Sequence, residues 1–390
     1  MKRCILTLGV LLVCVIWPLR AANDSIRISL LTCAPGTEIY SLFGHTAIRY
    51  QNLDRGEDYI YNYGVFSFNT PNFIYRFVKG ETDYQLGVVP YAYFEYAYAE
   101  RGSSVYQQTL NLTYEEKIKL KQLLDTNYRP ENRVYRYNYF FDNCTTRARD
   151  KIEAAIHGKV VYPEGAKGLS FRSIIHQYTV GHEWGEWGID FLLGEEADAE
   201  IDMHLQQFAP FYMLESARKA YIQVGDSQRP LVLEEEKIVD VDPLPAADFP
   251  LSPFQVVLAV MVLTVIVQYM QYKKGRIFWI WDLLLFGFQG LAGCIIAFLF
   301  FFSVHPTVGS NWLLWVFNPL PLLYLPVMIY RAIKGRKDLF HKINIVYLTI
   351  FIILMPFVAQ EFQATMLPLA LIFILCSIGH VVLYNRKIHS

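Results

Sequence analysis

The chain has 390 residues, enough for two or three domains, and its formal net charge is −1. A nearly neutral chain does not favour nucleic acid as a partner, and no P-loop, GxGxxG, CxxC or HExxH pattern occurs. Hydrophobic residues make up 53% and charged residues 18%, with the apolar residues concentrated at the extreme N-terminus and after residue 253. These features predict a membrane protein that binds no nucleic acid and uses no metal or cofactor.

Residues 1–22 have the pattern of a secretory signal peptide. Two basic residues precede the apolar stretch Cys4–Leu19, and Ala21 and Ala22 supply small residues for cleavage. The alternative is an uncleaved anchor. With either, the chain after Ala22 is exported.

Residues 23–224 have the composition of a globular α+β domain. Ile26–Thr32 is predicted to be a strand, and His45 begins a second strand that runs to Tyr50. A turn at residues 54–56 leads into a third strand, Asp58–Gly64, so the second and third strands form a predicted hairpin.

Residue alternation places polar side chains on one face of this hairpin. His45 shares a face with Ala47 and Arg49, and Asn62 shares a face with Asp58 and Ile60. If the two faces coincide, the Asn62 carbonyl comes within reach of the His45 imidazole. Asp58 competes for the same role, and a lone histidine is more often structural.

Further elements follow in the same domain. Strands are predicted at 84–89 and 105–112. Helices are predicted at 91–98 and 171–176, and a third helix begins at the capping box of Thr113 and Glu116 and runs to Leu124. Residues 184–194 are too rich in glycine and tryptophan for a plain helix, and we expect an aromatic core loop or the wall of a groove. Residues 225–252, acidic and proline-containing, are predicted to be a linker or a short extended arm.

Cys144 follows Asp142 and Asn143 at the predicted start of a helix. Free backbone N–H groups and the helix dipole stabilise a thiolate there, and Arg147 adds positive charge one turn later. Cys144 is therefore a candidate nucleophile. Because the exported compartment is oxidising, a disulfide with Cys33 is the competing interpretation.

Residues 253–390 are predicted to be an all-α transmembrane domain. Apolar runs at 254–272, 277–302, 312–330, 343–359 and 366–384 are each long enough to span a bilayer. Lysine and arginine follow the first, third and fifth runs, so these loops are cytoplasmic and residues 23–253 lie outside.

Several motifs carry a resemblance to a known family. They are Leu31–Gly36, Leu42–Arg49, Tyr61–Phe66, Asp142–Arg147 and Gly188–Gly194. A histidine at a strand start followed later by a cysteine at a helix start resembles the permuted papain-like group that includes lecithin:retinol acyltransferase. More closely, most of residues 23–220 resemble the periplasmic domain of the bacterial Lnb family of lipoprotein N-acyltransferases, and the multispan C-terminal half has the same layout.

The resemblance implies a permuted papain-like catalytic domain in the periplasm, fused to about five helices in the bacterial inner membrane. The implied catalytic residues are Cys144, His45 and Asn62, with Asn62 standing where the retinol acyltransferase group tends to have a second histidine. The implied reaction moves an acyl chain from a membrane phospholipid, through a Cys144 thioester, to the α-amine of a diacylated lipoprotein. Arg147 or Arg149 would meet the donor phosphate, although a solvated helix face is the commoner role for each.

Two other functions remain open at this point. One is a membrane-anchored cysteine peptidase or amidase that acts on cell-wall peptides with the same Cys144–His45 pair. The other is a non-enzymatic envelope protein in which Cys33 and Cys144 form a structural disulfide.

Overall fold

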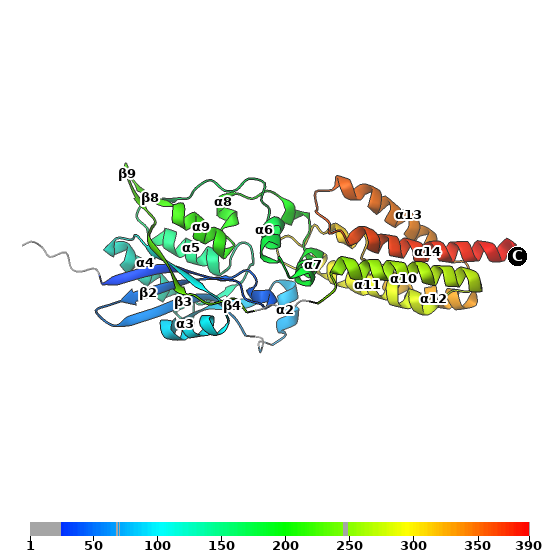
Figure 1. Ribbon diagram of the computed structural model, residues 1–390, viewed down its shortest axis with the longest axis horizontal. Helices are drawn as coiled ribbons and strands as arrows, with labels where there is room; N and C mark the ends of the chain where they lie inside the picture. Colours follow the sequence, from blue (N-terminus) through cyan, green and yellow to red (C-terminus); the bar gives the residue numbers. More distant parts are fainter. Residues whose placement is uncertain (1–24, 68, 70, 245–248, 390) are drawn as a thin grey trace, which may run out of the picture.

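The computed structural model describes residues 25–389, apart from residues 68, 70 and 245–248. An α+β domain is followed by a bundle of long helices, which extends from one end of the domain (Figure 1). The predicted fold class, a mixed α+β domain before an all-α membrane region, is confirmed. The predicted signal peptide lies outside the described residues.

The α+β domain is built on a seven-stranded sheet with the order β10-β5-β1-β2-β3-β4-β6, in which all neighbouring strands are antiparallel. A second sheet has the order β7-β8-β9. The strands are β1 Ile26–Cys33, β2 His45–Asn52, β3 Glu57–Val65, β4 Asp83–Pro90, β5 Val105–Leu110, β6 Val134–Arg136, β7 Lys159–Val161, β8 Tyr221–Val224, β9 Ser227–Pro230 and β10 Val232–Val239.

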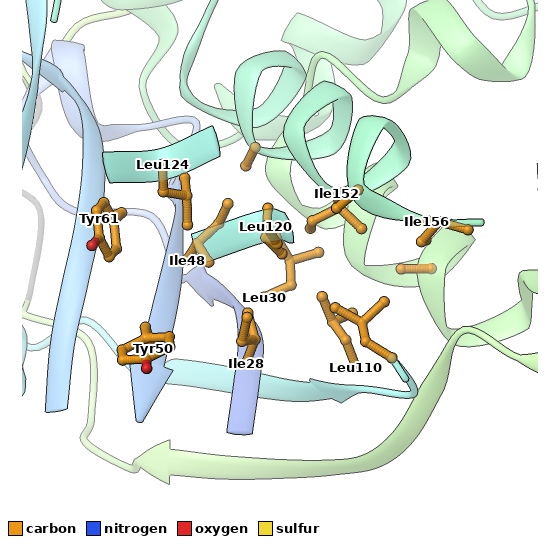
Figure 2. Packing of buried hydrophobic residues seen from close by; sticks show 14 of the residues in the cluster. Ile28, Leu30, Ile48, Tyr50, Tyr61, Leu110, Leu120, Leu124, Ile152 and Ile156 are labelled. Carbon is orange, nitrogen blue, oxygen red and sulfur yellow. The ribbon is translucent and has the colours of Figure 1, made fainter. Parts of the chain in front are cut away.

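Helices cover both faces of the large sheet, because its central strands are apolar on both sides. On one face, Ile28, Leu30 and Ile48 pack against Leu120 and Ile152 of helices α4 and α5 (Figure 2). The opposite face carries a smaller apolar cluster with helix α3. The helices of this domain are α2 Phe73–Lys79, α3 Tyr91–Glu100, α4 Tyr114–Tyr128, α5 Cys144–Ala155, α6 Phe171–Tyr178, α7 Glu183–Leu192, α8 Met203–Gln206 and α9 Pro210–Lys219, with short 3₁₀ turns η1 Ile39–Ser41 and η2 Glu195–Asp198.

The membrane region contains helices α10 Pro253–Lys274, α11 Trp279–Phe302, α12 Leu320–Lys334, α13 Leu339–Leu354 and α14 Met366–His389, with 3₁₀ turns η3 Trp312–Leu314 and η4 Met355–Phe357. Among the described residues, four helices are long and apolar enough to cross a bilayer. The prediction of a continuous span at 312–330 is wrong: its first part is η3, and the following prolines delay α12 until Leu320. At 15 residues, α12 rises only about 22 Å, which is less than the hydrocarbon thickness.

The basic loops of the membrane region meet at one end of the bundle. Arg276, Arg331, Arg336 and His380 line one small cavity there, and Arg386 donates to the carbonyl of Tyr272. This end lies away from the α+β domain (Figure 1). The arrangement agrees with a cytoplasmic location for these loops.

Residues 183–192 form helix α7, which docks the α+β domain on the bundle. The prediction of a non-helical loop here is wrong. The indole N–H of Trp187 donates to Thr365 Oγ1 at 2.9 Å, and that of Trp184 donates to the carbonyl of Leu251 at 2.8 Å. Packing of Trp187 and Phe191 against the bundle outweighs the poor helix propensity of the glycines.

The predicted linker at 225–252 is shorter in the structure, because strands β9 and β10 occupy its first half. Strand β10 pairs with β5 and forms one edge of the large sheet. The α+β domain therefore extends to Val239, and the connection to α10 begins after it.

Candidate active site

A cavity of about 620 Å³ lies where β2 begins, β3 ends and α5 begins. His45, Asn62 and Gly64 line it from the two strands, and Cys144 lines it from the first turn of α5. Much of the remaining wall is aromatic, and Glu38, Glu100 and Arg101 add charged groups to it. The aromatic residues include Phe43, Phe66, Tyr84, Tyr98, Tyr137, Tyr139 and Phe208.

The hairpin brings His45 and Asn62 together, as residue alternation had indicated. The antiparallel register of β2 and β3 pairs Ile48 with Tyr61, so His45 and Asn62 lie diagonally on one face. His45 Nε2 is 2.5 Å from Asn62 Oδ1. Because an amide oxygen only accepts, Nε2 carries the proton and Nδ1 is the nitrogen left for Cys144.

Asp58 lies near the other end of the hairpin and has different partners. It accepts hydrogen bonds from Arg49 at 2.9 and 2.6 Å and from Gln51. Of the two candidates for the third position, the structure places only Asn62 at His45.

Asn143 holds the start of helix α5 in place. Its Oδ1 accepts from the backbone N–H groups of Thr145 and Thr146, and its Nδ2 donates to the carbonyls of Tyr139 and Phe208. In the part of the chain that the structure describes, no hydrogen bond uses the Cys144 backbone N–H. That N–H is therefore free to face an oxyanion at the sulfur.

The environment of Cys144 favours a thiolate. Burial opposes the charge, but the charge and hydrogen bond of His45, the backbone N–H of Thr46 and the hydroxyl of Thr145 together lower the pKa of Cys144. A hydrogen bond between Thr46 Oγ1 and Thr145 Oγ1, at 3.0 Å, ties strand β2 to helix α5.

The pKa of His45 is raised, which complements the lowered pKa of Cys144. Burial acts to lower the pKa of His45, yet the Cys144 charge and hydrogen bond and the Asn62 hydrogen bond raise it above its usual value. The two shifts together favour a thiolate–imidazolium pair.

The pKa of Cys33, the other cysteine of the α+β domain, is shifted in the opposite direction from that of Cys144. Cys33 and Cys144 are both free thiols, and Cys33 is fully buried at the end of β1. Burial raises the pKa of Cys33, and the hydroxyl of Tyr98 offsets only part of this rise. Cys33 therefore remains a neutral core thiol, and the structure does not contain the disulfide considered above.

Comparison with protein-family models gives two matches. Residues 17–174 match the Lnb N-terminal periplasmic domain, and residues 245–388 match the Lnb transmembrane domain. The chain belongs to the Lnb family. Searches of curated proteins and of solved structures return no match, so the permuted papain-like arrangement stays a prediction.

The Lnb domain names agree with the division into a periplasmic part and a membrane part. This Lnb-family protein is thus a membrane protein with a periplasmic domain, and the site described above lies in that domain.

Two residues of the site have roles that the sequence analysis did not anticipate. Gly64 has a φ of +88°, and a Cβ added there would lie 3.9 Å from His45 Cε1 and 4.0 Å from Cys144 Cβ. Thr46 contributes through its backbone N–H. The sequence signal for Gly64 was its place in the motif Tyr61–Phe66, where a glycine interrupts an aromatic strand.

Arg147 and Arg149 do not line the cavity. Arg147 forms a bidentate ion pair with Asp142 at 2.6 and 2.7 Å, and Arg149 is buried against Asp150 and the carbonyl of His204. Arg101 lines the cavity instead and has no ion pair among the described residues.

Among the described residues, two groups of side chains have a spacing that could hold a metal ion, and neither is in the cavity. They are Asp150, Glu153 and His204, and His176, Glu186 and Asp190. Arg149 already pairs with the first group and Arg172 with the second, at 2.8 Å in each case. Protein cations thus already neutralise a carboxylate in each group.

Proposed function

We propose that this Lnb-family protein is a lipoprotein N-acyltransferase of the bacterial inner membrane. The observation that carries the proposal is the contact of Cys144, His45 and Asn62 in one aromatic cavity of the Lnb periplasmic domain. A cysteine whose pKa is lowered by a neighbouring imidazole suits acyl transfer through a thioester.

In the first step, Cys144 Sγ attacks an ester carbonyl of a membrane phospholipid. The S–C bond forms, the C–O ester bond breaks, and the imidazolium of His45 gives its proton to the departing alkoxide. The products are a lysophospholipid and acyl-Cys144. The free Cys144 N–H would stabilise the tetrahedral oxyanion, a contribution of about 3–4 kcal/mol for one such donor in other enzymes.

In the second step, the α-amine of the lipidated N-terminal cysteine of a diacylated lipoprotein attacks the thioester carbonyl. The C–N bond forms, the C–S bond breaks, and the amine proton passes to neutral His45. The thiolate–imidazolium pair is restored and the lipoprotein carries a third acyl chain. Asn62 holds the imidazole in the tautomer that serves both steps.

The Lnb membrane domain supports this choice of substrates over soluble ones. Both the phospholipid and the lipoprotein are anchored in the membrane, and the periplasmic domain is docked directly on the ends of the membrane helices. For a peptidase or amidase that acts on cell-wall peptides, a single anchor would suffice. We assign the donor phosphate to Arg101, the unpaired cation of the cavity wall, in place of Arg147 and Arg149.

The test is mass spectrometry of the N-terminal lipopeptide of a reporter lipoprotein, in a host that lacks its own N-acyltransferase. We expect three acyl chains with the parent protein and two with Cys144→Ala. Cys33→Ala, which removes the other thiol of the domain, is the matched control and should keep the third chain. Two chains with the well-expressed parent would overturn the proposal.

A further inference from the structure

Helix α2 presents apolar side chains outward. The exposed fractions of Ile74, Tyr75 and Phe77 are 78%, 55% and 49%. At helical spacing Ile74 and Val78 share one face, with Tyr75 and Phe77 on either side of it. This is a contiguous apolar surface on a helix of only seven residues.

The two charged residues of α2 lie on the other side of the helix, and each forms an ion pair. Arg76 pairs with Asp83 at 2.5 Å, and Lys79 pairs with Glu81 at 2.8 Å. A surface helix in water normally has the reverse arrangement, with charges outward and apolar residues inward. An outward apolar face is stable when its surroundings are apolar as well.

Helix α2 is attached to the end of the membrane helix α11 (Figure 1). The ring of Tyr75 lies 6.1 Å from that of Phe298, and the carbonyls of Val78 and Lys79 accept from Ser303 Oγ and the Val304 N–H, both at 2.9 Å. This end of α11 is opposite the basic loops. The α2 surface is therefore continuous with the lipid-facing side of the bundle, at the level where aromatic residues meet the membrane–water interface.

Helix α2 is also connected to the catalytic cavity. Phe66, in the cavity wall, stacks on Phe73 with ring centroids 5.8 Å apart, and Phe73 stacks on Phe77 at 6.0 Å. A continuous row of aromatic rings thus leads from the outward face of α2 to the wall of the site that holds Cys144.

We propose that α2 is an interfacial helix that lies in the outer leaflet, and that a phospholipid acyl chain passes along it into the cavity. The occupant of the α2 surface is bilayer lipid. The role in lipid entry rests on the acyltransferase function proposed above, whereas the membrane contact of α2 does not depend on it.

Photo-crosslinking of the full chain tests the contact directly. A benzophenone amino acid replaces Ile74, and in a separate protein it replaces Leu53, which is 57% exposed in the turn at the opposite end of the β2–β3 hairpin. Both proteins are reconstituted in vesicles of phosphatidylethanolamine and phosphatidylglycerol. We expect phospholipid adducts at position 74 and none at 53. Absence of adducts at 74, or equal adducts at both positions, would overturn the proposal.

A second measurement tests lipid entry. Acylation of Cys144 is followed with the vesicle phospholipid and with a short-chain, water-soluble ester. In Ile74→Asp the ratio of the vesicle rate to the soluble-ester rate should fall about tenfold or more, since a carboxylate on this face opposes its burial in lipid. Leu53→Asp should keep the parent ratio.

An unchanged ratio in Ile74→Asp would contradict the role of α2 in lipid entry. Failure of the acyltransferase function itself would look different: the parent protein would then acylate Cys144 from neither substrate, while crosslinks at position 74 would still report the membrane contact.

Discussion

For single residues, the hydrogen bond between His45 Nε2–H and Asn62 Oδ1 fixes the tautomer of the imidazole and so decides which nitrogen can bind Cys144. Asn62 holds Nε2–H, so Nδ1 faces Cys144, and each member of the pair shifts the pKa of the other toward the charged form. Removal of Asn62 should therefore change the titration of His45 as well as its orientation.

We predict that Asn62→Ala moves the high-pH limb of the acyl-transfer profile to lower pH and lowers the rate roughly tenfold, part of the 10²–10⁴ typical of acid–base catalysis. The Asn62 hydrogen bond raises the pKa of His45, so without it the imidazolium loses its proton at lower pH. The measurement is the pH–rate profile. Asp58→Asn, on the same strand face but bonded to Arg49, should leave the limb in place. A shift in Asp58→Asn alone would contradict the assignment of Asn62.

Arg101 gives a second prediction for a single residue. If its guanidinium binds the donor phosphate, Arg101→Ala should raise the KM for an anionic phospholipid about tenfold or more, because a charge-assisted hydrogen bond contributes about 1.5–3 kcal/mol. Arg55→Ala, at the exposed hairpin turn, is the control and should leave KM unchanged. An equal rise of KM in both variants would indicate that general surface charge, and not a phosphate site at Arg101, attracts the phospholipid.

For whole elements, the start of α5 depends on Asn143 more than helix starts usually depend on their cap. Asn143→Ala removes two N-cap bonds and two further bonds from Nδ2. We expect a loss of about 2–4 kcal/mol in unfolding free energy, and slower alkylation of Cys144. Thr113→Ala, the cap of α4, should cost about 1 kcal/mol and leave alkylation unchanged. Thermal unfolding measures the loss of stability, and the alkylation rate reports the reactivity of Cys144. Equal effects of the two variants in these measurements would contradict the prediction.

The elements that the sequence predicted well are those with local signals. Strands β1 to β5 follow from residue alternation, and α4 and α5 begin where a capping residue precedes an apolar period. The His45–Asn62 contact also followed from alternation, because the hairpin is local. The approach of Cys144 to His45 spans almost a hundred residues, and the ordered motifs of the family resemblance predicted it where periodicity could not.

The elements that were missed depend on distant partners. Strand β10 is acidic and resembles a linker until it pairs with β5, more than a hundred residues earlier. Helix α7 contains Gly185 and Gly188, and its packing against the bundle offsets their poor helix propensity. Arg147 and Arg149 were plausible phosphate ligands because their carboxylate and carbonyl partners could not be identified from spacing alone.

For the whole molecule, the hydrogen bonds between described residues hold the periplasmic domain on the bundle at two places. One is α2 with residues 303–305, and the other is the segment from α7 to η2 with residues 307–312 and 360–365. Two separate attachments oppose rotation of the domain relative to the bundle more than one would. That geometry suits an enzyme whose two substrates are both anchored in the bilayer.

Arg172 is the centre of the second attachment. It is 1% exposed and pairs with Asp190 at 2.8 Å and Asp198 at 2.5 Å. The same carboxylates also accept from the membrane region: Asp190 from Gln363 Nε2 at 2.9 Å, and Asp198 from the Glu361 N–H at 3.2 Å. Loss of Arg172 would leave the buried Asp198 carboxylate without a cation at the junction of domain and bundle, and Asp190 with His176 alone.

We therefore predict that Arg172→Met lowers the unfolding free energy by about 3–5 kcal/mol and exposes residues 249–252, which Trp184 of α7 contacts, to proteolysis. Arg218→Met is the matched control, because Arg218 also pairs with two carboxylates, Glu215 and Glu235, but is exposed. Its loss should cost at most about 1 kcal/mol and leave proteolysis unchanged. Thermal unfolding and limited proteolysis of the full chain measure both effects. Equal destabilisation by the two variants would mean that the buried cluster does not hold the domain on the membrane.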